Sequence, residues 1–461
     1  MIETVNPATG ELLAAYPTHS PAEIEALLGA AGSAQESWRD LPLAARTDLL
    51  RGLGSVLVER REQYAALITA EMGKPLAEAL AEVDKCALVC RFYADSAVGF
   101  LADEPIETDA DAVSLVRYEP LGVVLAIMPW NFPFWQVMRF AAPTVAAGNA
   151  ALLKHSPNVT GCALALGSLF VDAGFPPGLF GVLLLAEPSV ADTVGSLIED
   201  PRIAAVTLTG SERAGASVGA AAGRALKKAV LELGGSDPFV VLADADVPAA
   251  VDGAVRSRFA NAGQSCVCAK RFIVAESVAD EFEQAFVAAV AALPVGDPTA
   301  AGIRIGPMAR ADLVDDLARQ VDESVARGAR ILTGGGRVAG AGNHYAPTVL
   351  VDVVPEMSVF AEETFGPVAV VVRAADDDEA IALANQTRYG LGASVWSKDT
   401  AHALAVGRRI RSGALFVNGI VASDPRLPFG GVGRSGYGRE LGAAGIREFT
   451  NVRTVWARAF E

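Results

Sequence analysis

Hydrophobic and polar positions recur with a helical period through most of the first hundred residues. The run Ser20-Pro21-Ala22-Glu23 has the form of a capping box with proline at the first helical position, so a helix is predicted from there to Trp38. Similar patterns predict helices over residues 44–71 and 76–101. Residues 106–118 alternate loosely instead, which predicts a β-hairpin.

The pattern changes after residue 122, where short apolar runs alternate with helical segments. Buried strands are predicted at 123–127, 150–153, 181–185 and 204–208, with helices between them at 134–147, 160–173 and 190–198. A second series of strands is predicted at 239–242, 271–274, 331–332 and 368–372. This alternation is typical of parallel sheets with helices on both faces, so we expect an α/β protein with two doubly wound sheets. The tail at 450–460 is predicted as a late strand, for which the sequence indicates no partner.

Composition and charge narrow the classes of function. The chain has 461 residues, 51% of them hydrophobic, which is enough for two or three packed domains. Its net charge of −16 is offset by no basic block, so neither nucleic acid nor an anionic membrane is expected as a partner. The start lacks an apolar core and the longest apolar stretch, 161–171, is too short for a bilayer, so neither a signal peptide nor a membrane span is expected. Five unevenly spaced cysteines do not form a disulfide framework, which favours the reducing cytoplasm.

A cysteine and a glutamate are the strongest candidates for chemistry. Cys266 ends the run Asn261-Ala262-Gly263-Gln264-Ser265-Cys266, and Glu232 begins the run Glu232-Leu233-Gly234-Gly235. A thiol attacks as its thiolate, and a carboxylate can serve as a general base beside it. The alternative for Cys266 is the commonest role of a free cysteine, a small apolar residue in a core. No metal site is expected, because the cysteines and histidines form no recognisable set of ligands.

Two turns carry further candidates. The run from Thr207 to Gly215 follows a predicted strand and opens a helix, where backbone N–H groups favour an anion, although many such turns bind none. The run Pro129-Trp130-Asn131-Phe132-Pro133 ends another predicted strand, and its two prolines restrict the backbone. The Asn131 amide is thereby placed to donate to an oxyanion. The alternative for Asn131 is a structural residue of the turn.

Taken together, these motifs resemble the aldehyde dehydrogenase superfamily. The resemblance covers essentially the whole chain and keeps the family's order of motifs: Asn6-Pro7-Ala8-Thr9-Gly10, Pro129 to Pro133, Lys154, Thr209-Gly210-Ser211, Glu232 to Gly235, Gly263 to Cys266, Glu362 to Pro367 and Pro428-Phe429-Gly430-Gly431.

The resemblance implies a mechanism and a set of domains. Cys266 would attack an aldehyde, Asn131 would hold the oxyanion, and Glu232 would activate the water that releases a free acid. A dinucleotide-binding domain is expected from 1–101 and 121–232, a catalytic domain from 233–441, and an oligomerisation hairpin and tail from 102–120 and 442–461. The cofactor-binding residues implied are Trp130, Lys154, Ser156, Gly210, Ser211, Glu363 and Phe365.

The run Lys154-His155-Ser156-Pro157 bears on the choice of cofactor. Relatives that prefer NAD commonly carry a glutamate at the position of Pro157, where it bonds the adenosine 2′-hydroxyl. Without that carboxylate, a 2′-phosphate would meet Lys154 and Ser156 with no repelling anion nearby. NADP is therefore expected as the preferred cofactor, and NAD as the alternative.

Arg139 and Ser423 bear on the substrate. They match positions that hold the substrate carboxylate in succinate semialdehyde dehydrogenases, and the sequence around them resembles the short bacterial type of these enzymes. Succinate semialdehyde is therefore the expected substrate, although a structural salt bridge is the alternative for Arg139. A broader aliphatic or aromatic aldehyde dehydrogenase is the alternative function, with an apolar tunnel lined by Phe132, Trp135 and Phe429.

Other classes of function and a redox role stay open. A cofactor-independent thiol hydrolase or a non-enzymatic binding protein would use the same fold without turning over a cofactor. Cys268 suggests a regulatory disulfide with Cys266, against the alternative of a small buried residue. A homodimer or homotetramer is expected, because the hairpin and the tail strand have edges that need partners.

Overall fold

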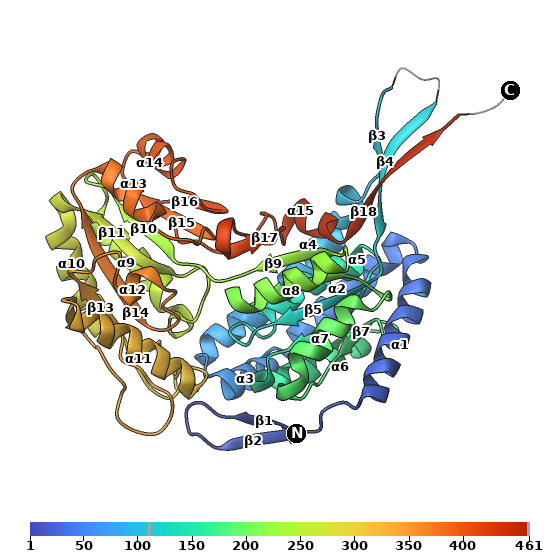
Figure 1. Ribbon diagram of the computed structural model, residues 1–461, viewed down its shortest axis with the longest axis horizontal. Coiled ribbons are helices and arrows are strands. Elements are labelled where there is room, and N and C mark those ends of the chain that lie inside the picture. Colours follow the sequence, from blue (N-terminus) through green and yellow to red (C-terminus); the bar gives the residue numbers. More distant parts are fainter. Residues whose placement is uncertain (109–111, 459–461) are drawn as a thin grey trace.

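Two sheets covered by helices make up the body of the protein (Figure 1). The structure is a computed structural model and describes residues 1–108 and 112–458. Figure 1 shows the seven-stranded sheet with its helices on the left and the six-stranded sheet on the right. The expected α/β fold with two sheets of mainly parallel strands is confirmed.

The six-stranded sheet has the order β17-β9-β8-β5-β6-β7, and all its neighbours are parallel except β17 and β9. Its central strands are buried along their length, as expected of a parallel sheet covered on both faces. The strands are β5 Val123–Met128, β6 Ala150–His155, β7 Phe180–Val182, β8 Ile203–Thr209, β9 Lys228–Glu232 and β17 Gly436–Tyr437. The helices around it are α1 Pro21–Arg39, α2 Leu43–Glu59, α3 Arg61–Met72, α4 Leu76–Phe100, α5 Trp135–Ala146, α6 Thr160–Asp172, α7 Val190–Glu199, α8 Glu212–Arg224 and α15 Gly442–Glu448.

The seven-stranded sheet has the order β12-β13-β14-β11-β10-β15-β16, and only its edge strand β12 runs antiparallel to its neighbour. Its strands are β10 Asp237–Val241, β11 Ala269–Ala275, β12 Arg330–Thr333, β13 Thr348–Val351, β14 Val368–Ala374, β15 Gly392–Trp396 and β16 Ala414–Val417. Its helices are α9 Val247–Phe259, α10 Glu276–Ala291, α11 Ala311–Ala326, α12 Ser358–Ala361, α13 Asp377–Asn385 and α14 Thr400–Gly407. The predicted domain limits stay a prediction, although β17 from the range 233–441 joins the other sheet.

The N-terminal hundred residues differ from the sequence prediction in two ways. The capping box at Ser20 is present, with both of its hydrogen bonds, and starts α1 as expected. The helix predicted over 44–71 is two helices, because the backbone at Arg60 leaves the helical region. The first residues form a small antiparallel pair, β1 Ile2–Val5 with β2 Leu12–Tyr16, which the sequence analysis missed.

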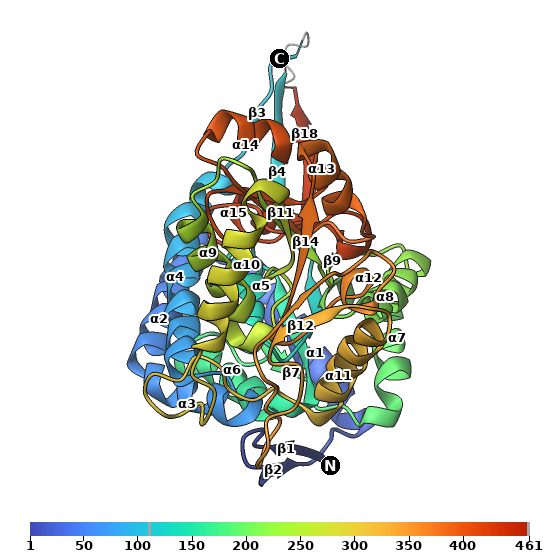
Figure 2. The same ribbon diagram turned by 90° about the vertical axis from the view of Figure 1, so that its left-hand side faces the viewer.

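A three-stranded antiparallel sheet extends away from the body in both views (Figures 1 and 2). It contains β3 Glu104–Pro105, β4 Val113–Pro120 and β18 Thr450–Ala457. The tail strand, for which the sequence indicated no partner, pairs with β4 from Thr450 opposite Pro120 to Ala457 opposite Val113. Residues 109–111 of the predicted hairpin and 459–460 of the predicted tail strand lie outside the described residues. No helix in the described part of the chain has the length and apolar character of a bilayer span.

Candidate active site

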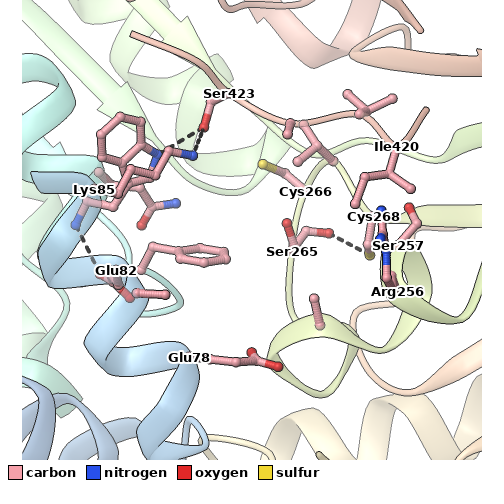
Figure 3. Close-up of a pocket in the computed structure, with 18 of the residues that line it drawn as sticks. Glu78, Glu82, Lys85, Arg256, Ser257, Ser265, Cys266, Cys268, Ile420 and Ser423 are labelled. Atoms are coloured by element: carbon pink, nitrogen blue, oxygen red, sulfur yellow. Dashed lines mark hydrogen bonds between the residues drawn. The ribbon is translucent and has the colours of Figure 1, made fainter. Parts of the chain in front are cut away.

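A cavity of about 390 Å³ lies between α4, α5, the loop before β11 and the segment 420–429 (Figure 3). It has an apolar wall and a few polar groups, as small-molecule sites usually do. Predicted residues that the fold brings together on its walls are Phe132, Trp135, Arg139, Cys266, Cys268, Ser423 and Phe429.

The candidate nucleophile Cys266 lies on a strained loop packed tightly against its surroundings. Gly263 has φ +73°, and a Cβ there would lie 2.2 Å from the Gly366 carbonyl oxygen. A Cβ on Gly235 would lie 2.7 Å from the Cys266 carbonyl oxygen, which instead accepts a hydrogen bond of 2.8 Å from Lys270 Nζ. Glycine is therefore needed at both positions for the loop to take this path.

Burial raises the pKa of the Cys266 thiol to about 12, while the positive charges of Arg139 and Lys270 act in the opposite direction. In this state the group is a thiol. Because only the thiolate attacks, the thiol proton has to be removed as the reactants bind.

Asn131 is buried beside this loop, and its side chain is held at both ends. Its Oδ1 accepts from Gln136 Nε2 at 3.0 Å, and its Nδ2 donates to the Gln264 carbonyl at 3.1 Å. An amide nitrogen carries two hydrogens, so one remains for a ligand. The arrangement suits the oxyanion role predicted for Asn131.

A buried ion pair behind Asn131 holds both this turn and the start of α5. Lys74 pairs with Glu82, and Lys74 Nζ also donates to the Asn131 carbonyl at 3.0 Å. The other oxygen of Glu82 accepts from the backbone N–H groups of Phe134 and Trp135, at 2.9 and 3.0 Å. The Glu82 carboxylate thus satisfies two free N–H donors at the start of α5 and interacts favourably with the positive end of the helix dipole. The sequence analysis missed this pair.

Glu232, the last residue of β9, is 2% exposed, and within the described residues neither carboxyl oxygen has a hydrogen-bond partner. Burial, and next the neighbouring Glu440, raise the pKa of Glu232 well above its usual range. Arg139 forms an ion pair with Glu440, and its charge acts on both Glu232 and Cys266. One guanidinium thus connects the candidate base with the candidate nucleophile.

The residues predicted for the nicotinamide end lie together. The rings of Trp130 and Phe365 meet edge to face, with centroids 5.7 Å apart. Glu363 Oε1 accepts from the Gly235 N–H at 3.0 Å and lies 3.4 Å from Lys270 Nζ. A Cβ on Gly234 would lie 2.3 Å from Glu363, so this glycine leaves the space that the carboxylate fills.

Another cavity, of about 730 Å³, lies between α7 and α8. Its lining includes Arg213 and Ala214 of the first turn of α8, but none of the four residues predicted for the adenosine end, Lys154, Ser156, Gly210 and Ser211. Ser211 caps α8, whose first turn carries free N–H groups that suit a pyrophosphate. Gly210 precedes it, and its N–H donates to the Glu232 carbonyl at 3.0 Å. The cavity and the helix N-terminus together fit a dinucleotide.

The expectation that no anion lies near Lys154 is wrong. Burial lowers the pKa of Lys154, but the carboxylate of Glu187, which lines the cavity between α7 and α8, acts in the opposite direction. Ser156 Oγ donates to Asn158 Oδ1 at 2.7 Å, so its oxygen lone pairs remain to accept.

Cys268 and Cys266 are both free thiols. Cys268 is buried, where Arg258 Nη1 donates to its sulfur at 2.7 Å and the sulfur donates to the Ser265 carbonyl at 2.9 Å. The disulfide between the two cysteines stays a prediction.

The Aldehyde dehydrogenase family matches residues 1–455. The chain belongs to the aldehyde dehydrogenase family. It is 51% identical to the probable succinate-semialdehyde dehydrogenase (NADP(+)) of Synechocystis sp. over 99% of each chain. It is 50% identical to the succinate semialdehyde dehydrogenase (NAD(P)+) of Escherichia coli, covering 98% of this chain and 97% of the relative.

Solved structures agree with this assignment. A succinic semialdehyde dehydrogenase of Streptococcus pyogenes, in complex with NADP+ as the cofactor, superposes with a TM-score of 0.96 at 35% identity, over 99% of both chains. An aldehyde dehydrogenase fold and an oxidoreductase activity, expected from the motifs, are therefore confirmed.

Two of the predicted substrate residues already have partners in the protein, and for Arg139 this partner forms the salt bridge named above as its alternative role. Arg139, expected to bind a substrate carboxylate, already faces the carboxylate of Glu440 and stacks over Phe429 at 4.7 Å. Ser423 accepts a hydrogen bond of 2.8 Å from Lys85, a residue of α4 that the sequence analysis did not single out. In the sequence, Lys85 is recognisable only as a residue of an amphipathic helix, and this position does not indicate a function.

Proposed function

We propose that the protein oxidises succinate semialdehyde to succinate, with NADP as its preferred cofactor and NAD as a second one. The observation that carries this proposal is a single cavity with the thiol of Cys266 on its wall and the polar pair Lys85–Ser423 beside it. The relatives named for succinate semialdehyde, with NADP or NAD(P) in their names, support both parts of the proposal.

The reaction follows from the residues in place. The thiolate of Cys266 adds to the aldehyde carbon, and the resulting oxyanion lies beside the free amide hydrogen of Asn131. NADP, with its nicotinamide end held by Trp130, Glu363 and Phe365, would supply the hydride acceptor. Loss of the hydride from this carbon would leave a thioester on Cys266. Glu232 takes a proton from water as the water attacks the thioester, and succinate leaves as the thiol is restored.

Lys154 and Ser156 are the residues we assign to the 2′-phosphate. The Lys154 ammonium supplies charge for that group, and the Ser156 hydroxyl would turn its hydrogen from Asn158 Oδ1 to the phosphate, whereas Glu187 limits the net positive charge around it. Because Glu187 offsets part of the charge of Lys154, we expect NADP to be preferred over NAD, while NAD can still be used.

The test is the rate of cofactor reduction at 340 nm with four-carbon aldehydes that differ in one group. Succinate semialdehyde is expected to give a kcat/KM at least about 100-fold above that of butanal, because a buried charged pair with good hydrogen bonds contributes about 3 kcal/mol. NADP is expected to exceed NAD.

A second candidate, a broader aldehyde dehydrogenase, is favoured by the aromatic wall of Phe132, Trp135 and Phe429. Equal kcat/KM for butanal, benzaldehyde and succinate semialdehyde would support it and contradict the main proposal.

The protein is further proposed to act as a homodimer or homotetramer in the cytoplasm. Its five free cysteines suit a reducing compartment. Strand β18 is the edge of the extended sheet, and Val452 and Trp456 on one face of it are 60% and 53% exposed. An open edge with exposed apolar side chains is a surface for pairing between subunits.

Changing both side chains on that edge is expected to break the assembly. Val452→Arg together with Trp456→Arg should convert the oligomer to smaller species in sedimentation velocity, because charges replace the apolar contact. Leu226→Arg, at a residue 94% exposed elsewhere, is the control and should leave the assembly intact. An unchanged sedimentation coefficient in the double variant would contradict a role for β18.

A further inference from the structure

Lys85 is a cation on the wall of the substrate cavity, and no carboxylate in the described part of the chain forms an ion pair with it. Its ammonium is partly buried 4.3 Å from the ring centre of Trp135 and donates to Ser423 Oγ at 2.8 Å. The two carboxylates that act on it are each committed to another cation, Glu82 to Lys74 and Asp424 to Arg426 at 2.6 Å. A desolvated ammonium in this position favours the arrival of an anion.

Ser423 is set to donate toward the same point. Its Oγ accepts from Lys85 Nζ and also from Trp135 Nε1 at 3.1 Å, and Figure 3 shows Ser423 near Cys266. A hydroxyl oxygen has two lone pairs, which these donors occupy, so the hydroxyl hydrogen is left for an acceptor in the cavity. Lys85 and Ser423 together therefore present an ammonium and an O–H donor to one ligand.

Arg139 is less available, although it lines the same cavity. Its guanidinium is 3% exposed, is paired with Glu440, and its Nη2 donates to Thr209 Oγ1 at 3.3 Å. Drawing it fully to a substrate would leave Glu440 as an unpaired buried carboxylate, which is strongly unfavourable.

We propose that Lys85, through its ammonium and together with the hydroxyl of Ser423, anchors the substrate's distal carboxylate. Arg139, on the same cavity wall, is paired with Glu440. The inference rests on the proposed function, because it assigns the residue that selects a carboxylated aldehyde within that function. Two methylene groups separate the aldehyde carbon from the carboxylate in succinate semialdehyde, so the anchor fixes which aldehyde reaches Cys266.

The anchor has a pH signature. Burial, and next the charge of Arg139, lower the pKa of Lys85 to about 8, while Cys86, Asp424 and Glu82 act in the opposite direction. The free enzyme therefore loses this positive charge as the pH rises through about 8. We expect the ratio of kcat/KM for succinate semialdehyde to that for butanal to fall above this pH, since titration of Cys266 and Glu232 affects both substrates alike.

The experiment compares Lys85→Met and Lys85→Arg with the wild-type protein, on both aldehydes with NADP. Lys85→Met is expected to raise KM for succinate semialdehyde about 10–100-fold with kcat within about threefold, and to leave butanal within about threefold. Lys85→Arg should restore most of the preference and remove its decline above pH 8, because arginine stays charged. Succinate should also inhibit butanal oxidation competitively in the wild type, and at least about tenfold more weakly in Lys85→Met.

Arg256→Met is the matched control, since Arg256 is a cation on the same cavity wall whose side chain is 57% exposed and paired with Asp252 at 3.5 Å. It should change the preference by less than about threefold. If the wild type prefers the carboxylated aldehyde and Lys85→Met keeps that preference, the role of Lys85 is wrong but the proposed function stands. A wild type with no preference would overturn the proposed function and the anchor with it. Equal losses on both aldehydes would make Lys85 a structural residue.

Discussion

Replacing Glu232 with glutamine is expected to lower the steady-state rate of NADP reduction by about 10²–10⁴-fold, the usual contribution of a general base. The first turnover should survive, because attack by Cys266 and departure of the hydride precede the step that needs the base. Stopped-flow absorbance should then show a burst of close to one NADPH per subunit, followed by a slow phase. Glutamine keeps the size of the side chain, which occupies a buried position against Gly430, so the fold should be retained.

The pH dependence of kcat is the control for this assignment. A general base works as its carboxylate, and burial together with Glu440 raises the pKa of Glu232 well above its usual range. In the wild type kcat should therefore fall as the pH decreases through that raised pKa, at a higher pH than an ordinary glutamate would give. The slow phase of Glu232→Gln should lack this acid limb. If Glu232→Gln shows no burst, or if its rate still falls at low pH as in the wild type, the general base must be another residue.

Replacing Asn131 with alanine is expected to lower kcat/KM about 10²–10³-fold, the range found when one oxyanion donor is removed, or about 3–4 kcal/mol of transition-state stabilisation. The loss should fall on kcat more than on KM, because the donor stabilises the negative charge that develops on the oxygen only as Cys266 adds to the aldehyde carbon. Unlike Glu232→Gln, this variant should show a slowed burst, since the affected step precedes hydride departure.

Asn131→Asp separates the amide donor from the shape of the side chain. Aspartate has a similar size but, when ionised, offers no donor, so it should be at least as impaired as alanine. Binding of NADP, followed by fluorescence titration, should stay within about threefold of the wild type in both variants. An aspartate variant with near wild-type turnover would show that Asn131 is a structural residue of the turn.

Local motifs were enough to find the residues that carry the chemistry. Cys266, Glu232 and Asn131 each lie in a short run with glycine or proline neighbours, and those neighbours set the backbone that holds them. The strand–helix rhythm likewise predicted the two sheets of mainly parallel strands, because central strands such as β5, β6 and β10 are almost entirely buried apolar runs. The strands β9, β13, β15 and β16 were not predicted.

Contacts between distant parts of the chain could not be predicted in this way. Lys85 and Ser423 are 338 residues apart, and the partner of the tail strand lies across most of the chain. Arg139 was predicted in the cavity, but its partner Glu440 comes from a late segment with no motif of its own. The break at Arg60 also escaped prediction, because neither glycine nor proline marks it.

The most direct test of the central claim is the mass of the Cys266 peptide from Glu232→Gln protein quenched in acid during turnover with succinate semialdehyde and NADP. The account predicts a succinyl group on Cys266, present only when both reactants are supplied and absent from the same peptide of a Glu232→Gln, Cys266→Ala double variant. Acylation of Cys268 instead, or a peptide without an acyl group while NADPH is formed, would contradict thioester formation at Cys266.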